Sequence, residues 1–573
     1  MIAVGLPCPR PGAQAPPVGD PTLRSGDRPP VFREEPRPAP GQVLPPVTPP
    51  PSPGPLEPLP SLRVFAREIR VVGSTAFSAE ELRRVTDPYI NREVTAEDLE
   101  ALRVALTYLY VNRGYVTSGA ILPDQRVSEG VITYRIVEGR LTAIDIQGNR
   151  WFRDGYLRDR LALAGRPPVD VNALQRRLQI LLNDPRIGRL NADLRPGLRA
   201  GEALLDVKVE DRFPFKLWLD VNNHQSPAVG AERGFLTLEH QNLTGNGDVL
   251  TLRYGRSEGL DPLLDVRYAV PVTPWDTIAS FQYRRNTFTV VEEPFDEIDI
   301  ESESEIFTLA TRQPVYRTPA AELALELIGE RLSHQTTLLG ERFTLTPGAR
   351  DGESIVTAVR FAQEFLHRSQ NQVIAARSRF SVGLDALGST VHGESLPDSQ
   401  FFAWLGQFQW VRRLGALDAL GLADTQLIFR TDVQLADDSL LTLEQVPVGG
   451  RFSVRGYREN TLVRDNAFLA SFEFRLPVVQ NVAWADYIQL APFVDYARAW
   501  QSAGRTPEPR YLASVGVGLR WAVTIRSPFA LRPAFEIYWG HPLRDVPTPE
   551  GDLQNRRNWQ DEGVHFQFVL AAF

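Results

Sequence analysis

Residues 213–573 alternate apolar and polar side chains in one segment after another, and no stripe of apolar residues at helical spacing interrupts them. The alternation is clearest near residue 470, where Phe468, Phe472 and Phe474 have one parity and Glu473 and Arg475 have the other. A period of two predicts strands with a single apolar face. Turn signals divide the region into sixteen predicted strands, an even number of the kind that closes an antiparallel bacterial barrel.

The sorting of side chains also indicates what surrounds the predicted barrel. A charged side chain on a lipid-facing surface costs about 2–4 kcal/mol at the middle of a bilayer, so the apolar parity is predicted to face lipid and the polar parity a wet lumen. The sequence has no apolar run of about 18 residues, so a membrane crossing by this chain uses strands. A soluble β-sandwich has the same period, but residues 213–573 would fill more than one sandwich and contain no linker.

The first sixty residues differ in composition from the rest. Ala13, Gln14 and Ala15 resemble the small-x-small end of a signal peptide, so residues 1–15 are predicted to be a possible remnant of an export signal. Residues 16–60 are dense in proline, which fixes φ and donates no amide hydrogen, and are predicted to be an extended linker. Cys8 is the one cysteine of the chain, so a disulfide framework is excluded.

Residues 61–139 and 140–212 repeat one order of elements: strand, helix, helix, strand, strand. In the first unit Ser78 and Glu81 have the spacing of a helix capping box, and a second helix is predicted to begin at Thr95. Each unit carries a stripe of leucines at helical spacing, which predicts a core: Leu99, Leu102, Leu106 and Leu109 in the first, and Leu174, Leu178, Leu181 and Leu182 in the second. The repeat predicts two tandem domains whose three-stranded sheets have exposed edges that can accept an extended chain.

Charge and motifs exclude several classes of function. The net charge of -8, from 62 basic and 70 acidic residues, argues against nucleic acid as a partner. No His-Glu-x-x-His or Gly-x-Ser-x-Gly segment is present, and no pair of carboxylates stands out by its spacing. We therefore predict no catalytic residues, no cofactor and no metal site, and a protein that is not an enzyme.

A short segment, Val454-Arg455-Gly456-Tyr457, lies in the long polar connection between the predicted strands 425–436 and 466–476. In the later predicted strand 486–498, the apolar residues at 488, 490, 494 and 496 have the outward parity, so Phe493 and Asp495 are predicted to point into the lumen. On the residues alone, Arg455 is an ordinary loop arginine and Asp495 a solvated lumen residue.

Three stretches of the first unit resemble a known family. Residues 114–118 (Gly-Tyr-Val-Thr-Ser), 122–125 (Leu-Pro-Asp-Gln) and 137–141 (Val-Glu-Gly-Arg-Leu) are similar to the first POTRA (polypeptide-transport-associated) domain of haemolysin secretion/activation proteins. These proteins are the TpsB-type outer-membrane transporters of two-partner secretion. The resemblance covers residues 64–573 and implies two POTRA domains, 61–139 and 140–212, followed by a sixteen-stranded antiparallel transmembrane barrel, 213–573.

The resemblance also implies roles for the two motifs. Val454, Arg455, Gly456 and Tyr457 match the family motif on the extracellular loop between strands eleven and twelve, which folds back into the lumen. Residues 492–500 match the barrel-wall motif, whose aspartate, here Asp495, holds the loop arginine; the wall motif usually has glycine at the position of Ala497. We expect a partly hydrated contact of about 0–1 kcal/mol if wet and more if shielded, suited to a latch that must yield.

The last residue, Phe573, is predicted to be a signal for barrel assembly, since outer-membrane barrels commonly end in an aromatic that the assembly machinery reads. Val569 and Ala571 share its parity, whereas Phe566 and Phe568 have the opposite one. Apolar residues on both parities predict a bulge or a late change of register in the final strand.

The predicted function is an outer-membrane pore that recognises a partner exoprotein of haemolysin or adhesin type in the periplasm and translocates it to the cell surface. The predicted partners are the unfolded exoprotein, bound through POTRA domains in the periplasm, the lipid of the Gram-negative outer membrane, and the barrel-assembly machinery. An outer-membrane assembly insertase of the same superfamily is the alternative, and a surface adhesin or a passive porin is a third.

Overall fold

The computed structural model describes residues 41–45, 63–293, 295–393, 396–415, 424–526, 530–546 and 558–573. Contacts divide the described residues into two compact units, one formed within residues 214–244 and 248–573 and the other within residues 41–213 together with 245–247. Within the described ranges, no helix is long and apolar enough to span a membrane. The predicted signal remnant, residues 1–15, lies outside the described residues.

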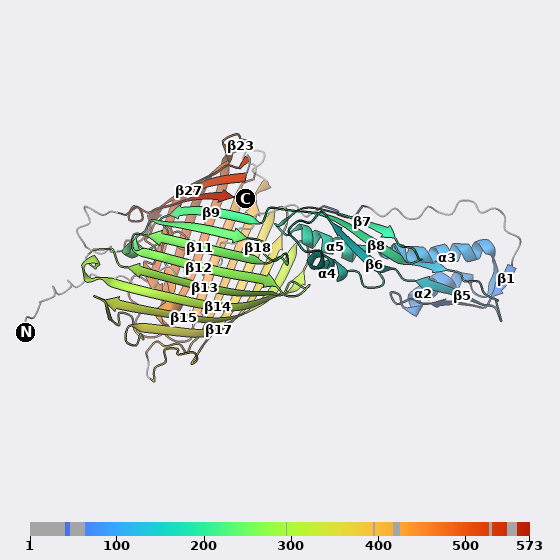
Figure 1. Cartoon of the computed structure of the whole chain (residues 1–573), viewed down its shortest axis with the longest axis horizontal. Helices are drawn as coiled ribbons and strands as arrows, with labels where there is room; N and C mark the ends of the chain where they lie inside the picture. The colour runs from blue at the N-terminus through green and yellow to red at the C-terminus, as the bar shows by residue number, and fades with distance from the viewer. Residues whose placement is uncertain are drawn as a thin grey trace, which may run out of the picture. The chain divides into compact units, whose positions relative to one another are not determined.

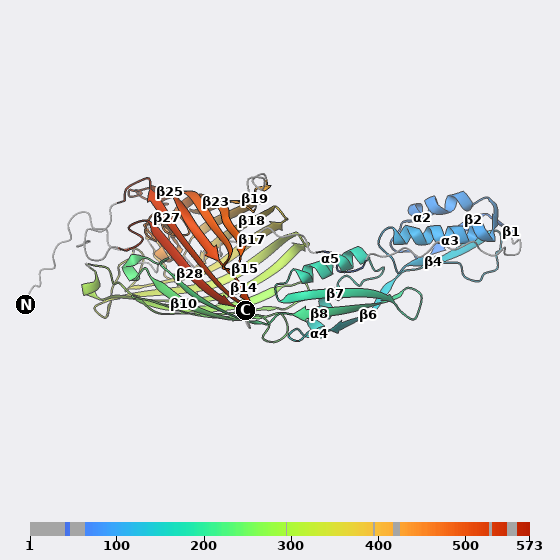
Figure 2. The same ribbon diagram turned by 90° about the horizontal axis from the view of Figure 1, so that it is seen from above.

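The first domain has the predicted order of elements, with one addition. Its elements are β1 (Arg63–Ala66), β2 (Glu68–Val72), α2 (Ala79–Thr86), η1 (Asp87–Tyr89), β3 (Arg92–Thr95), α3 (Ala96–Val111), β4 (Gly119–Ile121) and β5 (Val131–Val137). The main sheet has the order β2-β5-β4, and α2 and α3 run side by side along it (Figure 2). Strand β1 pairs with β3 in a small second sheet that the sequence did not predict.

Local signals place the helices of the first domain correctly. The Ser78 hydroxyl caps α2 and Thr95 caps α3, each in a complete capping box. The strand that follows α3 is short, because the Tyr115 N–H donates to the carbonyl of Tyr110 and the Tyr115 ring packs edge-on against the Tyr110 ring. Only residues 119–121 remain to pair in the sheet.

The core of the first domain contains the predicted leucines Leu99, Leu102 and Leu106, together with Tyr110, which is fully buried. The Tyr110 hydroxyl lies 2.6 Å from Ser74 Oγ and 3.1 Å from Glu138 Oε1. Burial raises the pKa of Tyr110 to about 12. The phenol therefore stays protonated and donates to the carboxylate at neutral pH.

The second domain repeats the order with β6 (Arg140–Gln147), α4 (Asp154–Ala162), α5 (Val171–Leu182), β7 (Ile187–Pro196) and β8 (Glu202–Asp211). Its sheet has the order β6-β8-β7, with β6 parallel to β8 and β7 antiparallel to it. Leu174, Leu178 and Leu181 are buried in the core as predicted, and Leu182 is partly buried. The internal repeat seen in the sequence is therefore a repeat of topology.

A short piece of the proline-rich segment, residues 41–45, contacts the second domain. Leu44 is buried among the core side chains of that domain, and its backbone N–H donates to Gln175 Oε1 of α5 at 2.9 Å. Gln179 Nε2 donates to the Gly41 carbonyl at 3.3 Å. This piece has neither helix nor strand, but it packs on the domain instead of crossing solvent as a spacer. The rest of the predicted linker lies outside the described residues.

The second unit is a closed antiparallel barrel (Figure 1). Its last strand, β28, pairs with its first, β9. Sixteen long strands form its described wall, and β16 (Glu341–Arg342) and β26 (Ile525–Arg526) are two-residue additions. The long strands are β9 (Phe215–Asn222), β10 (Arg233–His240), β11 (Val249–Ser257), β12 (Leu260–Pro271), β13 (Ile278–Thr289), β14 (Ile300–Arg317), β15 (Ala321–Leu338), β17 (Glu353–Arg368), β18 (Gln372–Leu384), β19 (Phe402–Arg413), β20 (Gln426–Ala436), β23 (Asn466–Val482), β24 (Ala485–Trp500), β25 (Tyr511–Ala522), β27 (Ala530–Pro542) and β28 (Val564–Ala572).

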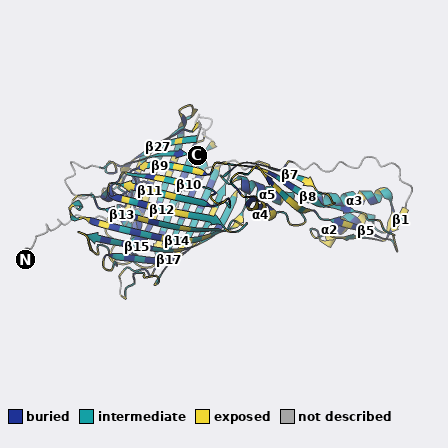
Figure 3. Ribbon diagram, viewed as in Figure 1, coloured by how far each residue is buried: buried dark blue, intermediate teal, exposed yellow. Residues whose placement is uncertain are grey.

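Residues along these strands alternate between more exposed and more buried positions, and Figure 3 shows the change of burial along the ribbons. Phe472 is 44% exposed on the outside of β23, whereas the next residue, Glu473, is fully buried inside. On β24, Val494 is exposed while Phe493 and Asp495 are buried, which is the predicted parity. An apolar exterior with charged groups inside is the arrangement expected of a barrel in lipid.

The predicted bulge in the final strand is wrong. Strand β28 pairs residue by residue with β27 from Val564 to Ala572, without a register shift. Ala571 and Phe573 line the lumen, so the opposite parity, which contains Phe566 and Phe568, is the outer one. Both parities are apolar near the end of the chain because small and aromatic side chains fill the lumen there.

Candidate functional site: a loop anchored inside the barrel

Residues 437–465, here called the lumen loop, join the eleventh long strand, β20, to the twelfth, β23. The loop contains a short 3-10 turn, η5 (Thr442–Glu444), and a small hairpin of β21 (Val446–Val448) and β22 (Leu462–Arg464). Arg455 lies between the strands of this hairpin and is 1% exposed. The loop therefore turns inward and places a fully buried cation inside the barrel.

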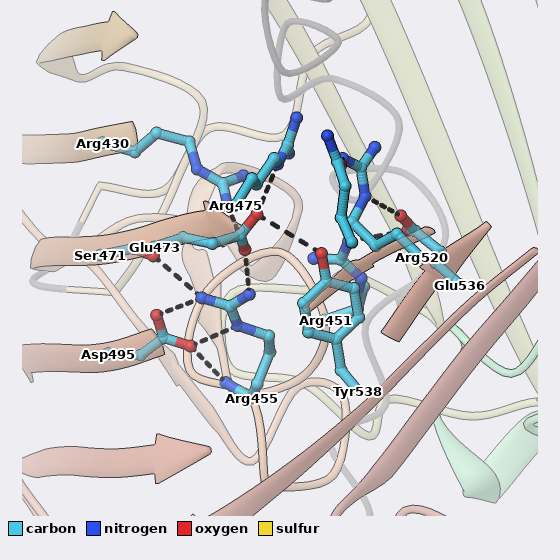
Figure 4. A network of polar contacts seen from close by, with 11 residues as sticks. Arg430, Arg451, Arg455, Ser471, Glu473, Arg475, Asp495, Arg520, Glu536 and Tyr538 are labelled. Atoms are coloured by element: carbon cyan, nitrogen blue, oxygen red, sulfur yellow. Dashed lines mark hydrogen bonds and ion pairs between the residues drawn. The ribbon is translucent and has the colours of Figure 1, made fainter. Parts of the chain in front are cut away.

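Arg455 contacts the two inward-facing carboxylates of neighbouring strands (Figure 4). Its Nε and Nη2 atoms donate to the two oxygens of Asp495 on β24, at 2.7 and 2.8 Å, and its own backbone N–H donates to the same carboxylate at 3.1 Å. Nη1 donates to Glu473 on β23. The guanidinium carbon also lies 3.6 Å from the centre of the Phe493 ring. Two carboxylates, which accept four hydrogen bonds from Arg455, and one aromatic face thus hold this residue.

The burial of this contact differs from the expectation of a partly hydrated pair. Arg455, Asp495 and Glu473 each have 1% of the side chain exposed. Removing one partner of a buried pair costs about 3–5 kcal/mol, because the other charge is left without compensation. The value of about 0–1 kcal/mol expected for a wet contact is therefore too low for this geometry.

Gly456 lies directly against the barrel wall. Its φ is +93°, a conformation that L side chains rarely adopt, and an added Cβ would lie 2.7 Å from the carbonyl oxygen of Gly540 on β27. A Cβ on Gly540 would in turn meet the backbone of Arg455 and Gly456 at 2.7–2.8 Å. Two glycines thus let the loop backbone approach the wall closely enough for Arg455 to reach its partners.

Val454 and Tyr457 belong to an apolar cluster. Val454 is fully buried and Tyr457 is 5% exposed, and both pack with side chains of the β21–β22 hairpin and of the wall, including Ala497. The Tyr457 hydroxyl lies 2.9 Å from the carbonyl oxygens of both Ala513 and Arg544. Hydrophobic contacts therefore hold the loop in place together with the ion pairs.

A second ionic anchor, which sequence reasoning missed, lies elsewhere on the wall. Glu444 of the lumen loop accepts from both terminal nitrogens of Arg360 on β17, at 2.8 and 3.2 Å. Arg360 also donates to Glu330 on β15 and to Ser381 on β18. Glu444 is 3% exposed and Arg360 is 4% exposed. No sequence motif marks this pair, since its residues are 84 positions apart and charged residues are common in the chain.

Two further arginines of the loop reach the wall. Arg451 donates to Glu536 on β27 at 2.7 Å and lies over the Tyr538 ring at 4.0 Å. Arg458 pairs with Asp561, just before β28, and with Glu292, in the connection after β13. The lumen loop is thus fastened to strands around the barrel and not to Asp495 alone.

Phe573 follows β28, and its backbone N–H donates to the Ala530 carbonyl of β27 at 3.0 Å. Its ring lines the lumen, with Lys216 Nζ 6.0 Å from the ring centre. Across the described ranges, no group of three or more His, Cys, Asp or Glu side chains is arranged to hold a metal ion.

These features together define a class of protein. A closed barrel with an apolar exterior and a charged lumen, crossed by an anchored loop and preceded by β-α-α-β-β domains, is a transport barrel of the outer membrane with POTRA domains on its periplasmic side. The family model described as haemolysin secretion/activation protein ShlB/FhaC/HecB matches residues 201–521, and the ShlB-type POTRA domain model matches residues 64–139. The chain belongs to this family of two-partner secretion transporters.

Individual relatives agree with the family. The chain is 24% identical to the outer membrane transporter CdiB of Dickeya dadantii (strain 3937) over 437 residues, which cover 73% of this chain and 74% of the relative. It is 22% identical to the hemolysin transporter protein ShlB of Serratia marcescens, covering 80% and 79%. Among solved structures, CdiB from Escherichia coli matches with a TM-score of 0.65 and 19% identity over 92% of this chain and 93% of that one, which shows a shared fold.

Proposed function

We propose that this transporter exports one secreted partner protein and that the lumen loop is the internal latch of its pore. The observation that carries the proposal is the fully buried contact of Arg455 with Asp495 and Glu473. A loop fastened across the lumen obstructs a chain in transit, so export requires that these contacts break. Val454, Arg455, Gly456 and Tyr457 form the latch, and Phe493 and Asp495 form its site on the wall.

The exoprotein is proposed to bind first to the two periplasmic domains. Each has a three-stranded sheet whose edge strands have no further strand partner among the described residues, β2 and β4 in the first and β6 and β7 in the second. An extended segment that adds to such an edge gains main-chain hydrogen bonds without needing a fixed sequence. This mode suits an unfolded partner. Transport of this kind needs no catalytic residue, and folding of the partner at the cell surface supplies the direction.

Phe573 is proposed to act before the barrel closes. In the finished barrel its strand, β28, pairs with both β27 and β9, so the edge of β28 can pair with another strand only before the barrel closes. The barrel-assembly machinery is the partner proposed for that step. Outer-membrane lipid is the partner of the finished barrel, through exposed apolar side chains such as Phe472 and Val515.

Replacing Arg455 with alanine tests the latch in cells that express the partner. Secretion of the partner is expected to fall, because the loop no longer adopts one position in the lumen, while the barrel still assembles and remains heat-modifiable on a gel. Arg464→Ala is the matched control, since Arg464 lies in the same loop and, within the part of the chain that the structure describes, donates only to the adjacent Val463 carbonyl. Unchanged secretion by a correctly assembled Arg455→Ala protein would refute the latch.

A further inference from the structure

A cavity of about 660 Å³ lies inside the barrel against the lumen loop. Arg451, Phe452 and Arg455 of that loop form one wall, and strand residues form the rest. The lining extends to Arg532 and Phe573, at the end of the barrel where β9 begins. The volume is that of an ordinary ligand site.

The lining of this cavity is strongly cationic. Counting described residues only, nine arginines and four carboxylates line it, and Asp220, Asp265, Asp432 and Glu536 are the carboxylates. Clefts lined by one sign of charge and bounded by low-dielectric walls focus the field and concentrate counter-ions. Rings of arginine in a pore likewise favour anions. The cavity therefore favours negatively charged occupants.

The excess of arginines over carboxylates is largest beside the latch, where Figure 4 shows the arginine side chains close together. Within the part of this network that the structure describes, five arginines share three carboxylates. Arg430 lies 3.9 Å from Glu473, and its Nε has no hydrogen-bond partner among the described residues. The same is true of the Nε atom of Arg451. Uncompensated charge in a water-poor site is costly, so an added anion stabilises this arrangement.

We propose that this cavity binds carboxylate-rich stretches of extended polypeptide, namely acidic segments of the exported chain, through Arg430, Arg475 and Arg520. The inference rests on the proposed export function, which brings an extended chain to this space. A guanidinium matches a carboxylate with two parallel hydrogen bonds, so three arginines provide a repeated site for acidic side chains. Arg451 belongs to both the network and the lumen loop. A carboxylate bound there competes with Glu536 and so links arrival of the chain to release of the loop.

The test is direct binding of labelled hexaglutamate to the purified full-length protein in detergent, with hexalysine as the opposite-charge probe. Hexaglutamate is expected to bind and hexalysine not, and the affinity is expected to fall with added salt. Arg430→Gln combined with Arg475→Gln is expected to weaken binding about tenfold or more, as loss of charge-assisted hydrogen bonds predicts. The matched control is Arg256→Gln, an exposed arginine of β11 whose affinity for hexaglutamate should equal wild type.

If the double variant does not fold, the single variant Arg430→Gln takes its place in the binding measurement, because it removes the least well-paired cation. Arg430→Lys with Arg475→Lys keeps the charge and is expected to retain most of the affinity. Equal binding of the two peptides, or wild-type affinity in the glutamine variants, overturns the inference. The binding assay does not depend on secretion. A negative binding result therefore does not contradict the latch, and unchanged secretion by Arg455→Ala does not contradict the anion-binding site.

Discussion

Neutralising Asp495 by replacement with asparagine is the sharpest perturbation of the lumen loop. The substitution keeps the size of the side chain and one acceptor oxygen, and removes the charge that faces Arg455. The Arg455 guanidinium donates to both oxygens of Asp495, at 2.7 and 2.8 Å, and the pair is 1% exposed. Because water has little access to this pair, it does not replace the interaction with Arg455 that the substitution removes.

The expected magnitude follows from this burial. Breaking a buried ion pair by removing one partner costs about 3–5 kcal/mol. Glu473 remains in contact with Arg455, so the lower end applies, about 3 kcal/mol. Since about 1.4 kcal/mol is a factor of ten, the balance between the docked and the released loop shifts by roughly two orders of magnitude.

Hydrogen exchange reports this balance, because the backbone N–H of Arg455 donates to Asp495 Oδ2 and exchanges only when the loop opens. In Asp495→Asn the peptide around residue 455 is expected to exchange about 100-fold faster than in wild type. Asp486→Asn is the control, since Asp486 lies on the same strand and accepts from Thr524, away from the loop. Exchange within about threefold of wild type, less than 1 kcal/mol, would refute the account of a loop held by this pair.

The remaining predictions concern other contacts. Glu444→Gln removes one of the two carboxylates that Arg360 contacts in the described residues and leaves Glu330. It is expected to speed exchange at residues 440–446, with little effect at 455 if the two anchors are independent. Gly456→Ala forces a Cβ against the Gly540 carbonyl at positive φ, so a cost of about 1–3 kcal/mol and lower secretion are expected. The control is Gly340→Ala, where φ is also positive, at +80°, but the space is open, so only the contact with the wall differs. Although burial of Glu138 disfavours its charge, hydrogen bonds from Thr75 and Ala76 outweigh this and hold its pKa below the ordinary value of 4.5. Its stabilising contribution is therefore present above about pH 4.5 and lost as pH falls through the lowered pKa, and Glu138→Gln should flatten that loss in acid titrations of hydrogen exchange at β5 in the full chain.

Much of the fold follows from local patterns. The parity of β23 and β24 was readable because a period of two, sorted between lipid and lumen, is a property of each strand by itself. The capping residues Ser78 and Thr95 marked two helix starts for the same reason, since a cap needs only residues three positions apart. Arg455 and Asp495 were paired only with the help of the family resemblance. The parity of a strand predicts which side chains face the lumen, but it does not predict which residue each of them contacts.

What the sequence determined by itself is which residues face inward; what the tertiary structure decided is which of them meet. Glu444 and Arg360 are 84 positions apart, and Gly456 touches Gly540 only because the barrel closes and the lumen loop crosses to that wall. The same closure excludes water around Arg455 and turns a contact expected to be weak into a buried pair. Strand register, loop path and burial are long-range properties, so no local pattern in the chain encodes them separately.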